Sequence, residues 1–295
     1  LSVNITRLAL SDRMPQAGLD LTATLTTLAN YNLDTQVSSL SDVAVAIQAS
    51  MKGDMTFNGD IRATIPATSF DLAKMYLDLP SVSLSGNYTT SLMTGRQTIS
   101  ADAAMTFDVA KEALTVKSLN LKTAGLSASA NMSGTKVLSA PNIKGALNLA
   151  EFNLRSLMGI LKIEYTPADE AALTKVSLGT NFTFAGNVLK APLKLTLDGN
   201  IIDTDATVDL SKKKPSIIAN MVIDALVLDK YLPAAAEPST APSTQTAQSA
   251  PQSSPVKIEF PDIKLDLTTL PDVTASVKSN KLTRAGHDLS AISAK

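Results

Sequence analysis

The sequence predicts a mainly β protein, in which a long antiparallel meander of strands is interrupted by a few short helices. Apolar and polar residues alternate with period two through most of the 295 residues, which is the pattern of strands with one dry and one wet face. Short turns separate the alternating segments, so strands that follow one another are expected to pair. Residues 152–161 are almost the only segment in which apolar residues recur at helical spacing.

The first group of strands is expected between residues 19 and 65. Residues 19–25 alternate between apolar and polar side chains as one strand. Asn58-Gly59 lies between two later alternating runs and indicates a hairpin, because a type I′ turn needs positive φ at both positions. A short crossover helix is predicted near residues 70–78, and Pro80 is expected to end it.

A second group of strands follows, from residue 82 to residue 148. The alternation slips by one residue at 118–121, which indicates a β-bulge or a bend. Another short helix is predicted near residues 153–162, with Asn153 as its N-cap, because its side chain can accept from the free amides of the first turn. The apolar stripe of this helix consists of Leu154, Leu157, Met158 and Leu161.

The third group shows the clearest alternation. A short helix is predicted near residues 168–174, because Pro167 precedes two acidic residues that suit a first helical turn. The strands after it carry apolar residues in a single phase, which would place them on one face of a sheet. These residues are Phe182, Phe184, Leu193, Leu195, Leu197, Ala206, Val208, Leu210, Ile217, Ala219, Met221 and Ile223.

Residues 234–256 differ in composition from the rest of the chain. They consist almost entirely of Ala, Pro, Ser, Thr and Gln. Such a segment cannot bury enough apolar surface to offset its ordering entropy, so a flexible linker is predicted. Strand patterns resume in residues 257–295 and stop in the middle of an alternating run. Since the chain also opens on Leu1 rather than Met, we expect it to be a segment of a longer protein.

Composition excludes several classes of function. The chain has 26 basic and 27 acidic residues, so it carries neither the electrostatic footprint of a nucleic-acid-binding protein nor a polybasic membrane patch. It has no Cys, which excludes disulfides and thiolate metal sites. Trp is absent and aromatic residues make up 4% of the chain, so the apolar side chains are suited to pave a surface rather than fill a thick core. No run approaches the roughly 20 apolar residues of a membrane-spanning helix.

The sequence offers little for catalysis. His287 is the only His and lies in a turn-like segment without partners for a triad or a metal site. Asp203, Asp205 and Asp209 share the polar phase of one strand but lack the Gly and bidentate Glu of a calcium loop, so a solvated face is expected. We therefore expect a protein that is not an enzyme and needs neither cofactor nor metal. Residues 212–214 are interpreted as a soluble hairpin tip, or alternatively as a contact for anionic headgroups.

An aromatic residue followed by Asp or Asn and then Leu begins at Phe70 and at Phe152, and a shorter copy, Leu228-Asp229, follows at similar spacing. Self-similarity of this kind is typical of repeat architectures. The run at 152–160 resembles the F-D-L-R-x-L-L-x-x-L-G-I segment of AsmA family proteins, and residues 166–178 resemble the T-x-D-P-x-A-L segment that follows it in the family. Residues 228–233 are similar to its L-D-x-Y-L-P element.

The resemblance implies a long curved antiparallel sheet, built of repeated meander units that form an open apolar groove, with the short crossover helices near 70–78, 153–162 and 168–174. It divides the chain into groove units at 1–80, 81–165 and 166–233, the linker at 234–256, and the start of a further unit at 257–295. The first and last units would be incomplete. The boundaries follow the repeated crossovers.

The resemblance also implies a function and a place in the cell. AsmA-like proteins are bridge-like lipid transfer proteins of the bacterial periplasm, anchored to the inner membrane by a helix that lies outside this chain. The expected ligand is phospholipid, with its acyl chains against the twelve in-phase apolar residues, and the expected roles are lipid transport between the two membranes and outer-membrane homeostasis. No nucleic-acid partner is expected.

The residues alone leave alternatives open. The apolar face could be covered by a second sheet, by the same sheet curling on itself, or by a ligand. An assembly factor for outer-membrane β-proteins would use exposed edge strands to bind its clients. A closed β-sandwich with an adhesin-like structural role is the third alternative.

Overall fold

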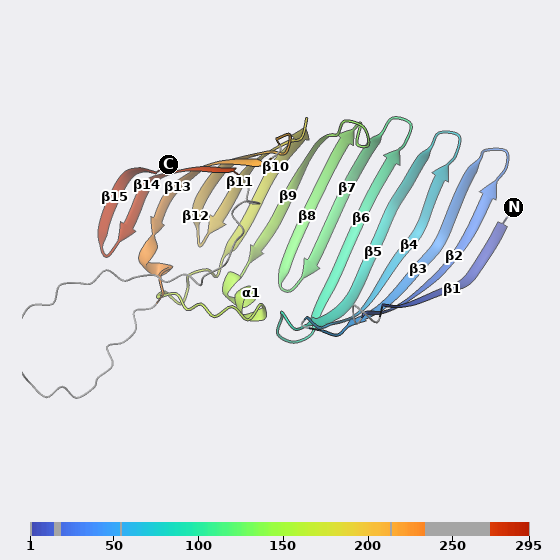
Figure 1. Cartoon of the computed structure of the whole chain (residues 1–295), viewed down its shortest axis with the longest axis horizontal. Coiled ribbons are helices and arrows are strands. Elements are labelled where there is room, and N and C mark those ends of the chain that lie inside the picture. The colour runs from blue at the N-terminus through green and yellow to red at the C-terminus, as the bar shows by residue number, and fades with distance from the viewer. Residues whose placement is uncertain (1, 15–18, 54, 213, 234–271, 295) are drawn as a thin grey trace, which may run out of the picture.

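The computed structural model describes residues 2–14, 19–53, 55–212, 214–233 and 272–294. These residues form one 15-stranded sheet in which the order of the strands follows the order of the chain (Figure 1). The sheet is long, open and mostly antiparallel, which confirms the predicted fold class. Within the described part of the chain no second sheet packs against it.

The strands are 8 to 15 residues long and are joined mainly by short turns. They are β1 (Ser2–Met14), β2 (Leu19–Asn32), β3 (Val37–Met51), β4 (Phe57–Asp71), β5 (Tyr76–Thr90), β6 (Gln97–Asp108), β7 (Ala113–Thr123), β8 (Leu126–Thr135), β9 (Asn142–Phe152), β10 (Val176–Ala185), β11 (Val188–Leu197), β12 (Asn200–Asp209), β13 (Ser216–Val227), β14 (Asp272–Arg284) and β15 (His287–Ala294). A helix, α1 (Leu154–Ile160), follows β9, and a 3₁₀ turn, η2 (Leu228–Lys230), follows β13.

The antiparallel pairing places alternate turns on opposite rims of the sheet. The upper rim is formed by the turns after β2, β4, β6, β8, β10 and β12, and the lower rim by the connections after β3, β5, β7, β9 and β11 (Figure 1). Among the fifteen described strands, only β13 and β14 pair in parallel. The predicted linker at 234–256 lies outside the described residues. Residues 272–294, within the unit predicted at 257–295, form β14 and β15.

The upper-rim turns after β4 and β6 are capped in the same way, by an Asp side chain. The carboxylate of Asp71 accepts from the backbone N–H of Lys74 at 3.0 Å, and that of Asp108 accepts from Lys111 N–H at 2.9 Å. In both turns the lysine Nζ also bridges the carboxylate, at 2.9 and 2.7 Å. These hydrogen bonds hold the pKa of both carboxyl groups below their usual value. A side chain that replaces backbone partners in this way favours a turn over a helix.

From the turn after β2 to the turn after β8, each upper-rim turn is also hydrogen bonded to the next. The N–H of Leu72 donates to Gln36 O at 3.0 Å, and the N–H of Val109 donates to Met75 O at 2.8 Å. The acceptors Gln36 and Met75 have φ of 55° and 51°, a left-handed conformation that turns their carbonyls toward the neighbouring hairpin. The upper rim from β2 to β9 is therefore one connected line of turns rather than a set of separate loops.

The helix predicted near residues 70–78 is wrong. The segment is the hairpin turn between β4 and β5, and Phe70 pairs with Leu77 across it. Its counterpart in the chain is Phe107-Asp108-Val109-Ala110-Lys111, which forms the same capped turn after β6. The apolar residues of 70–78 fall at helical spacing by coincidence, because they belong to the ends of two adjacent strands and to the turn between them.

The other two predicted helices have different outcomes. The helix near 153–162 is confirmed as α1, and the side chain of Asn153 accepts from Ser156 N–H as its N-cap. The helix near 168–174 is wrong, because those residues form turns. There the Asp169 carboxylate accepts from Ala171 N–H at 2.8 Å, and the last N–H groups of the segment donate outside it.

Bulges interrupt the strands without breaking the sheet. The slip predicted at 118–121 is confirmed, since the register of β7 with β8 shifts between Val116 and Leu119. A similar shift in β5 follows Leu79, at Pro80, which has no N–H to give to a ladder. The predicted boundary between residues 80 and 81 falls inside β5, so the sheet runs on without a break there. The division into groove units stays a prediction.

Two glycines of the sheet lie where a side chain would collide with its neighbours. A Cβ on Gly86 would come within 2.3 Å of the carbonyl oxygen of Asp60 and 2.9 Å of the Cα of Ile61. A Cβ on Gly145 would meet the carbonyl of Asn131 at 2.5 Å and the ring of Phe182 at 2.8 Å. These contacts require glycine because the neighbouring strand backbone approaches too closely for any larger residue.

We predict that Gly86→Ala lowers the free energy of unfolding by about 1–3 kcal/mol, because the added methyl group must displace backbone atoms. Gly179→Ala is the matched control, since a Cβ on that strand glycine meets nothing closer than the Asn148 side chain at 3.8 Å. Urea unfolding followed by circular dichroism measures both variants. Equal losses of stability in the two variants would contradict the close backbone approach at Gly86.

Candidate functional site

One face of the sheet is apolar across twelve consecutive strands, β2 to β13, and is called the apolar face below. Each residue of a strand lies directly opposite a partner on the neighbouring strand, so one central row of side chains can be followed across the sheet. The row contains only aliphatic side chains. It consists of Leu25, Val45, Ala63, Leu84, Ala101, Leu121, Ala128, Leu149, Leu178, Leu195, Ile202 and Ile223.

No Asp, Glu, Lys or Arg stands at any paired position on the apolar face of β2 to β13. The charged residues of these strands fall on the opposite face, where Lys194 pairs with Asp203 and Lys144 with Ser133. At a strand spacing of about 4.8 Å, twelve strands make a face about 55 Å wide. A contiguous apolar surface of that extent is far larger than the patches that soluble monomers normally leave exposed.

The side chains of the apolar face are mostly half-buried. They are shielded by one another, since in the described part of the chain no layer covers them. Gly59 and Gly145 are each overlaid by an aromatic ring, that of Phe57 and that of Phe182 respectively. Phe57 also stacks with Tyr88, at 6.2 Å between ring centroids. Aromatic rings thus cover the gaps in the side-chain surface that these two glycines leave.

The structure brings together all but one of the twelve predicted residues. Phe184 pairs with Leu189, Leu193 with Thr204, and Val208 with Ile217, and the remaining positions follow in the same phase. Leu210 is the exception, because β12 ends at Asp209. It lies in the following upper-rim turn, 51% exposed, with its N–H bonded to Asn187 O at 2.8 Å.

Most of the residues that sequence reasoning missed lie in β2 to β9, and a few, such as Leu178 and Ile202, lie in β10 to β12. Strands β2 to β9 contribute the larger part of the apolar face, with residues such as Leu84, Leu121 and Leu147. The signal was present as alternation in each strand. Bulges change its phase within β5 and β7, so no single phase could be followed through the sequence.

The polar face carries Asp203, Asp205 and Asp209, as predicted from their phase. Among the described residues no group of three or more His, Cys, Asp or Glu side chains is placed to hold a metal ion. His287 pairs with Arg284 at the turn between β14 and β15 and is exposed. No helix in the described part of the chain has the length and apolar character needed to cross a membrane.

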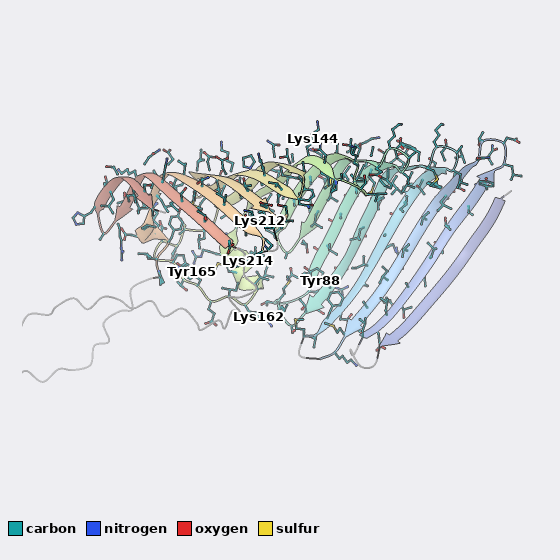
Figure 2. All side chains as sticks on the ribbon, turned by 45° about the horizontal axis from the view of Figure 1, so that its top comes forward. Tyr88, Lys144, Lys162, Tyr165, Lys212 and Lys214 are labelled. Carbon is teal, nitrogen blue, oxygen red and sulfur yellow. The ribbon has the colours of Figure 1, made fainter. Side chains whose placement is uncertain are left out.

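The crossover at residues 153–175 lies along the lower rim, below the sheet in Figure 1. It leaves and rejoins adjacent strands, because Phe152 pairs with Val176. On one side Thr94 N–H donates to Ile160 O at 2.7 Å, and Lys162 Nζ donates to Ser91 O at 2.7 Å. Figure 2 shows Lys162 and Tyr165 on this segment. The helix α1 is thus tied to the turn after β5 and does not project freely.

On its other side the crossover is held by the end of β13. Ala168 N–H donates to Leu232 O at 2.8 Å, and Asp169 N–H donates to Lys230 O at 3.2 Å. The hydroxyl of Tyr165 donates to the carbonyl oxygen of Tyr231. The crossover therefore joins the turn after β5 to the segment after β13, although those two places are far apart in the sequence.

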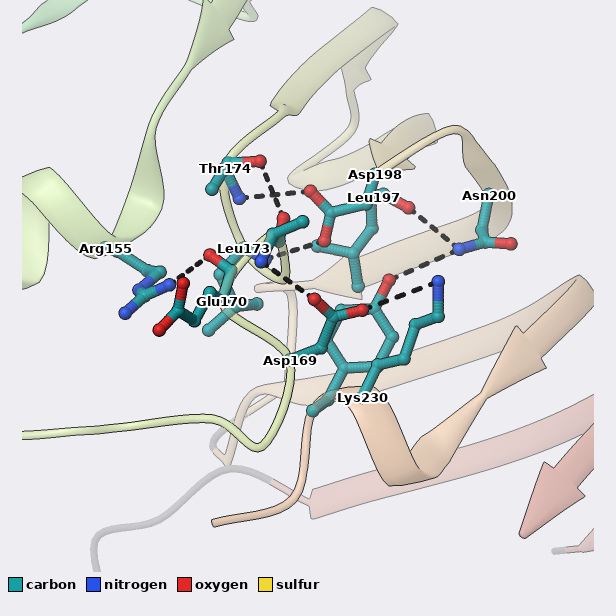
Figure 3. A network of polar contacts seen from close by, with 11 residues as sticks. Arg155, Asp169, Glu170, Leu173, Thr174, Leu197, Asp198, Asn200 and Lys230 are labelled. Carbon is teal, nitrogen blue, oxygen red and sulfur yellow. Dashed lines mark hydrogen bonds and ion pairs between the residues drawn. The ribbon is translucent and has the colours of Figure 1, made fainter. Parts of the chain in front are cut away.

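One carboxylate fixes the return of the crossover to the sheet (Figure 3). Asp198, in the tight turn between β11 and β12, accepts from the backbone N–H groups of Leu173 at 2.6 Å, Thr174 at 3.0 Å and Lys175 at 2.9 Å. Because this segment forms no helix, its backbone N–H groups need acceptors elsewhere, and the Asp198 carboxylate accepts from three of them. Asp198 is therefore an anchor, and its oxygen atoms are occupied by the chain itself.

A cavity of about 300 Å³ lies beside this anchor, lined by residues that include Asn200, Lys230 and Tyr231. The amide of Asn200 donates to the hydroxyl of Tyr231 at 3.3 Å. Burial, together with the negative charge of Asp198, raises the pKa of Tyr231, so the phenol stays neutral at physiological pH. The polar groups that line the cavity include the Asp198 carboxylate that holds the crossover in place.

We predict that Asp198→Asn accelerates amide hydrogen exchange at residues 173–175 by roughly tenfold, because an amide offers one fewer acceptor oxygen to the three donors. Asn tolerates the φ of 48° found at this position, so the backbone of the turn should persist. Asp205→Asn, on the polar face, is the matched control and should leave these amides unchanged. Exchange measured by mass spectrometry would contradict the anchor if both variants behaved like the wild type.

Comparison with protein-family models, with curated proteins and with solved structures finds no match to this chain. The described residues combine an uncharged apolar face across twelve strands, a polar opposite face and a crossover that ties the lower rim together.

Proposed function

We propose that this chain is the periplasmic segment of an AsmA-like envelope protein, and that it binds phospholipid acyl chains on its apolar face. In this proposal it carries lipid between the inner and outer membranes and so supports outer-membrane homeostasis. The observation that carries the proposal is the central aliphatic row, unbroken by any polar side chain from Leu25 to Ile223.

The hydrophobic effect supplies the binding energy. Each methylene group that an acyl chain removes from water contributes about 0.8 kcal/mol, so even partial contact along a chain adds up to tight binding. A charged residue within the row would have to be desolvated against the lipid tail, and none is found at its paired positions. The absence of charge therefore suits a ligand that is apolar along its whole length.

The distribution of polar groups suits the other end of a lipid. Charged residues stand in the turns at both rims, such as Lys74 and Asp71 at the upper rim and Lys230 and Asp169 at the lower rim. A phospholipid with its tails on the apolar face would leave its headgroup at a rim, in water. Such binding is passive and needs no cofactor.

The segments that resemble the AsmA family support the proposal by their location. Residues 152–160 form the end of β9 and α1, and residues 166–178 form the rest of the crossover and the start of β10. Residues 228–233 hold that crossover through the bond from Ala168 N–H to Leu232 O. Three segments chosen from sequence alone thus meet at one structural junction. Anchoring through an inner-membrane helix outside this chain remains part of the proposal.

We predict that purified wild-type protein carries phospholipid detectable by native mass spectrometry, and that Leu195→Asp reduces the bound fraction by roughly tenfold or more. Leu195 lies in the central row between Leu178 and Ile202. The new carboxylate must either lose its hydration or keep lipid away from the row.

Thr196→Asp is the matched control, because it adds the same charge one residue along β11 on the opposite face, where Thr196 pairs with Ile201. It should retain the wild-type lipid fraction, and far-ultraviolet circular dichroism should show equal β content in both variants. Wild-type protein that carries no phospholipid, and takes none up from liposomes, would refute the proposed function. Crosslinking to an outer-membrane barrel without bound lipid would favour the assembly-factor alternative.

A further inference from the structure

The upper rim presents a repeated pattern of exposed aliphatic side chains. In the turns after β2, β4 and β12, the residue after the capping Asn or Asp is leucine, namely Leu33, Leu72 and Leu210. These are 71%, 42% and 51% exposed, and Leu138 in the turn after β8 is 68% exposed. Hairpin tips normally carry Gly, Asn, Asp or Ser, so an exposed leucine in each of these four upper-rim turns calls for a partner.

In the turns after β4, β6 and β12, an Asp and a Lys are paired with the carboxylate more buried than the ammonium group. The carboxylate side chains of Asp71 and Asp108 are each only 16% exposed, since they accept hydrogen bonds from their own turns. Their partners Lys74 and Lys111 are each 79% exposed. The Asp209 and Lys212 pair after β12 repeats the arrangement, at 23% and 59%. These three turns therefore shield their carboxylates and present lysine, whereas the turn after β2 presents Asp34 beside Leu33.

The tips are held in line. The N–H of Leu72 donates to Gln36 O, that of Val109 to Met75 O, and that of Val137 to Glu112 O. Adjacent tips are two strands apart, which is about 10 Å. From β2 to β9 these turns follow one another along the upper edge of the sheet (Figure 1). Leu33, Leu72 and Leu138, which we call the upper-rim row, thus form a fixed line rather than independent loops.

The upper-rim row is continuous with the apolar face. Directly inside the turns lie Phe70, Leu77, Phe107 and Leu114, which pair in sequence across β4 to β7. Large apolar side chains thus extend from the central row to the rim without a charged paired residue between them. A lipid tail could pass over this edge without crossing a polar barrier.

We infer that the upper rim between β2 and β9 docks on the surface of a phospholipid bilayer, with the row of leucines in the interface and the lysines toward anionic headgroups. Exposed lysine beside aliphatic residues is the composition of segments that lie in a membrane interface. The inference rests on the proposed function, because a lipid-carrying face needs an edge through which lipid reaches it.

The test is flotation of the whole chain with vesicles of phosphatidylcholine, with and without phosphatidylglycerol. Wild-type protein should float with the vesicles that contain phosphatidylglycerol, and added salt should weaken the association. The triple variant Leu33→Ser, Leu72→Ser, Leu138→Ser should lower the partition coefficient by roughly tenfold or more, since it removes three aliphatic side chains from the interface.

The lower rim provides the matched control. Met55→Ser, Leu92→Ser, Ile163→Ser changes three side chains that are 53%, 56% and 50% exposed in the lower-rim connections. This variant should float like the wild type. The inference is overturned if the wild type does not float, if the control variant loses as much as the upper-rim variant, or if neither variant loses binding, since the apolar face would then be the contact.

A second measurement separates this inference from the proposed function. Native mass spectrometry of the wild type, after lipid is supplied from detergent micelles, reports loading of the apolar face without any need for a bilayer. Loading without flotation overturns the docking edge and leaves the proposed function in place. Flotation without loading supports the docking edge and refutes the proposed function.

Discussion

The register of the β-ladder is the constraint on which the rest of this structure depends. Side chains alternate between faces with a period of two, so a slip of one residue in any strand would move its aliphatic residues to the polar face and its charged residues among the apolar ones. From β2 to β13 this does not happen, although several strands carry bulges. Where β7 gains residues between Val116 and Leu119, both ends stay in phase with β8. The uncharged face is thus a property of twelve strands together.

A single-layer sheet places unusual demands on its own stability. Among the described residues no facing layer buries its apolar surface, so cross-strand neighbours and backbone hydrogen bonds supply most of the stabilisation there. Close backbone approach at Gly86 and Gly145 tightens the ladder. The capped turns of the upper rim and the Asp198 anchor of the lower rim hold the strand ends, where a sheet otherwise frays. An exposed apolar face and firmly anchored strand ends are compatible, because the face uses the middle of each strand and the anchors use its ends.

Much of the fold could be predicted from the sequence, because strand alternation depends on neighbouring residues only. The antiparallel meander, α1 with its Asn153 cap and the bulge at 118–121 all follow from local patterns. The helix near 70–78 could not be distinguished from a hairpin, since the side chain of Asp71 suits a helix start and a capped turn equally. The prediction of a helix at residues 168–174 failed for another reason. Its backbone N–H groups find their acceptor in Asp198, a residue that lies beyond the next two strands.

The candidate site, like the fold, could be predicted from the sequence only in part. Eleven of the twelve predicted residues share the apolar face because β10 to β13 keep a single phase, whereas Leu210 fell beyond the end of its strand. The contribution of β2 to β9 depended on how bulges realign neighbouring strands. That information is in the pairing and not in any one segment. Pattern reasoning therefore located the right surface but saw only part of its extent.

The contacts of each strand in this sheet are made with the strands beside it, which in this molecule are its neighbours in sequence. An added or lost pair of strands outside the span from β5 to β13, which the crossover ties together, would then change the length of the molecule by about 10 Å and leave the contacts of the crossover as they were. Insertions and deletions of whole hairpins should be tolerated in evolution far better than single-residue shifts. The reach of such a protein can thus adapt to a wider or narrower gap by changes in gene length alone, with no redesign of a core.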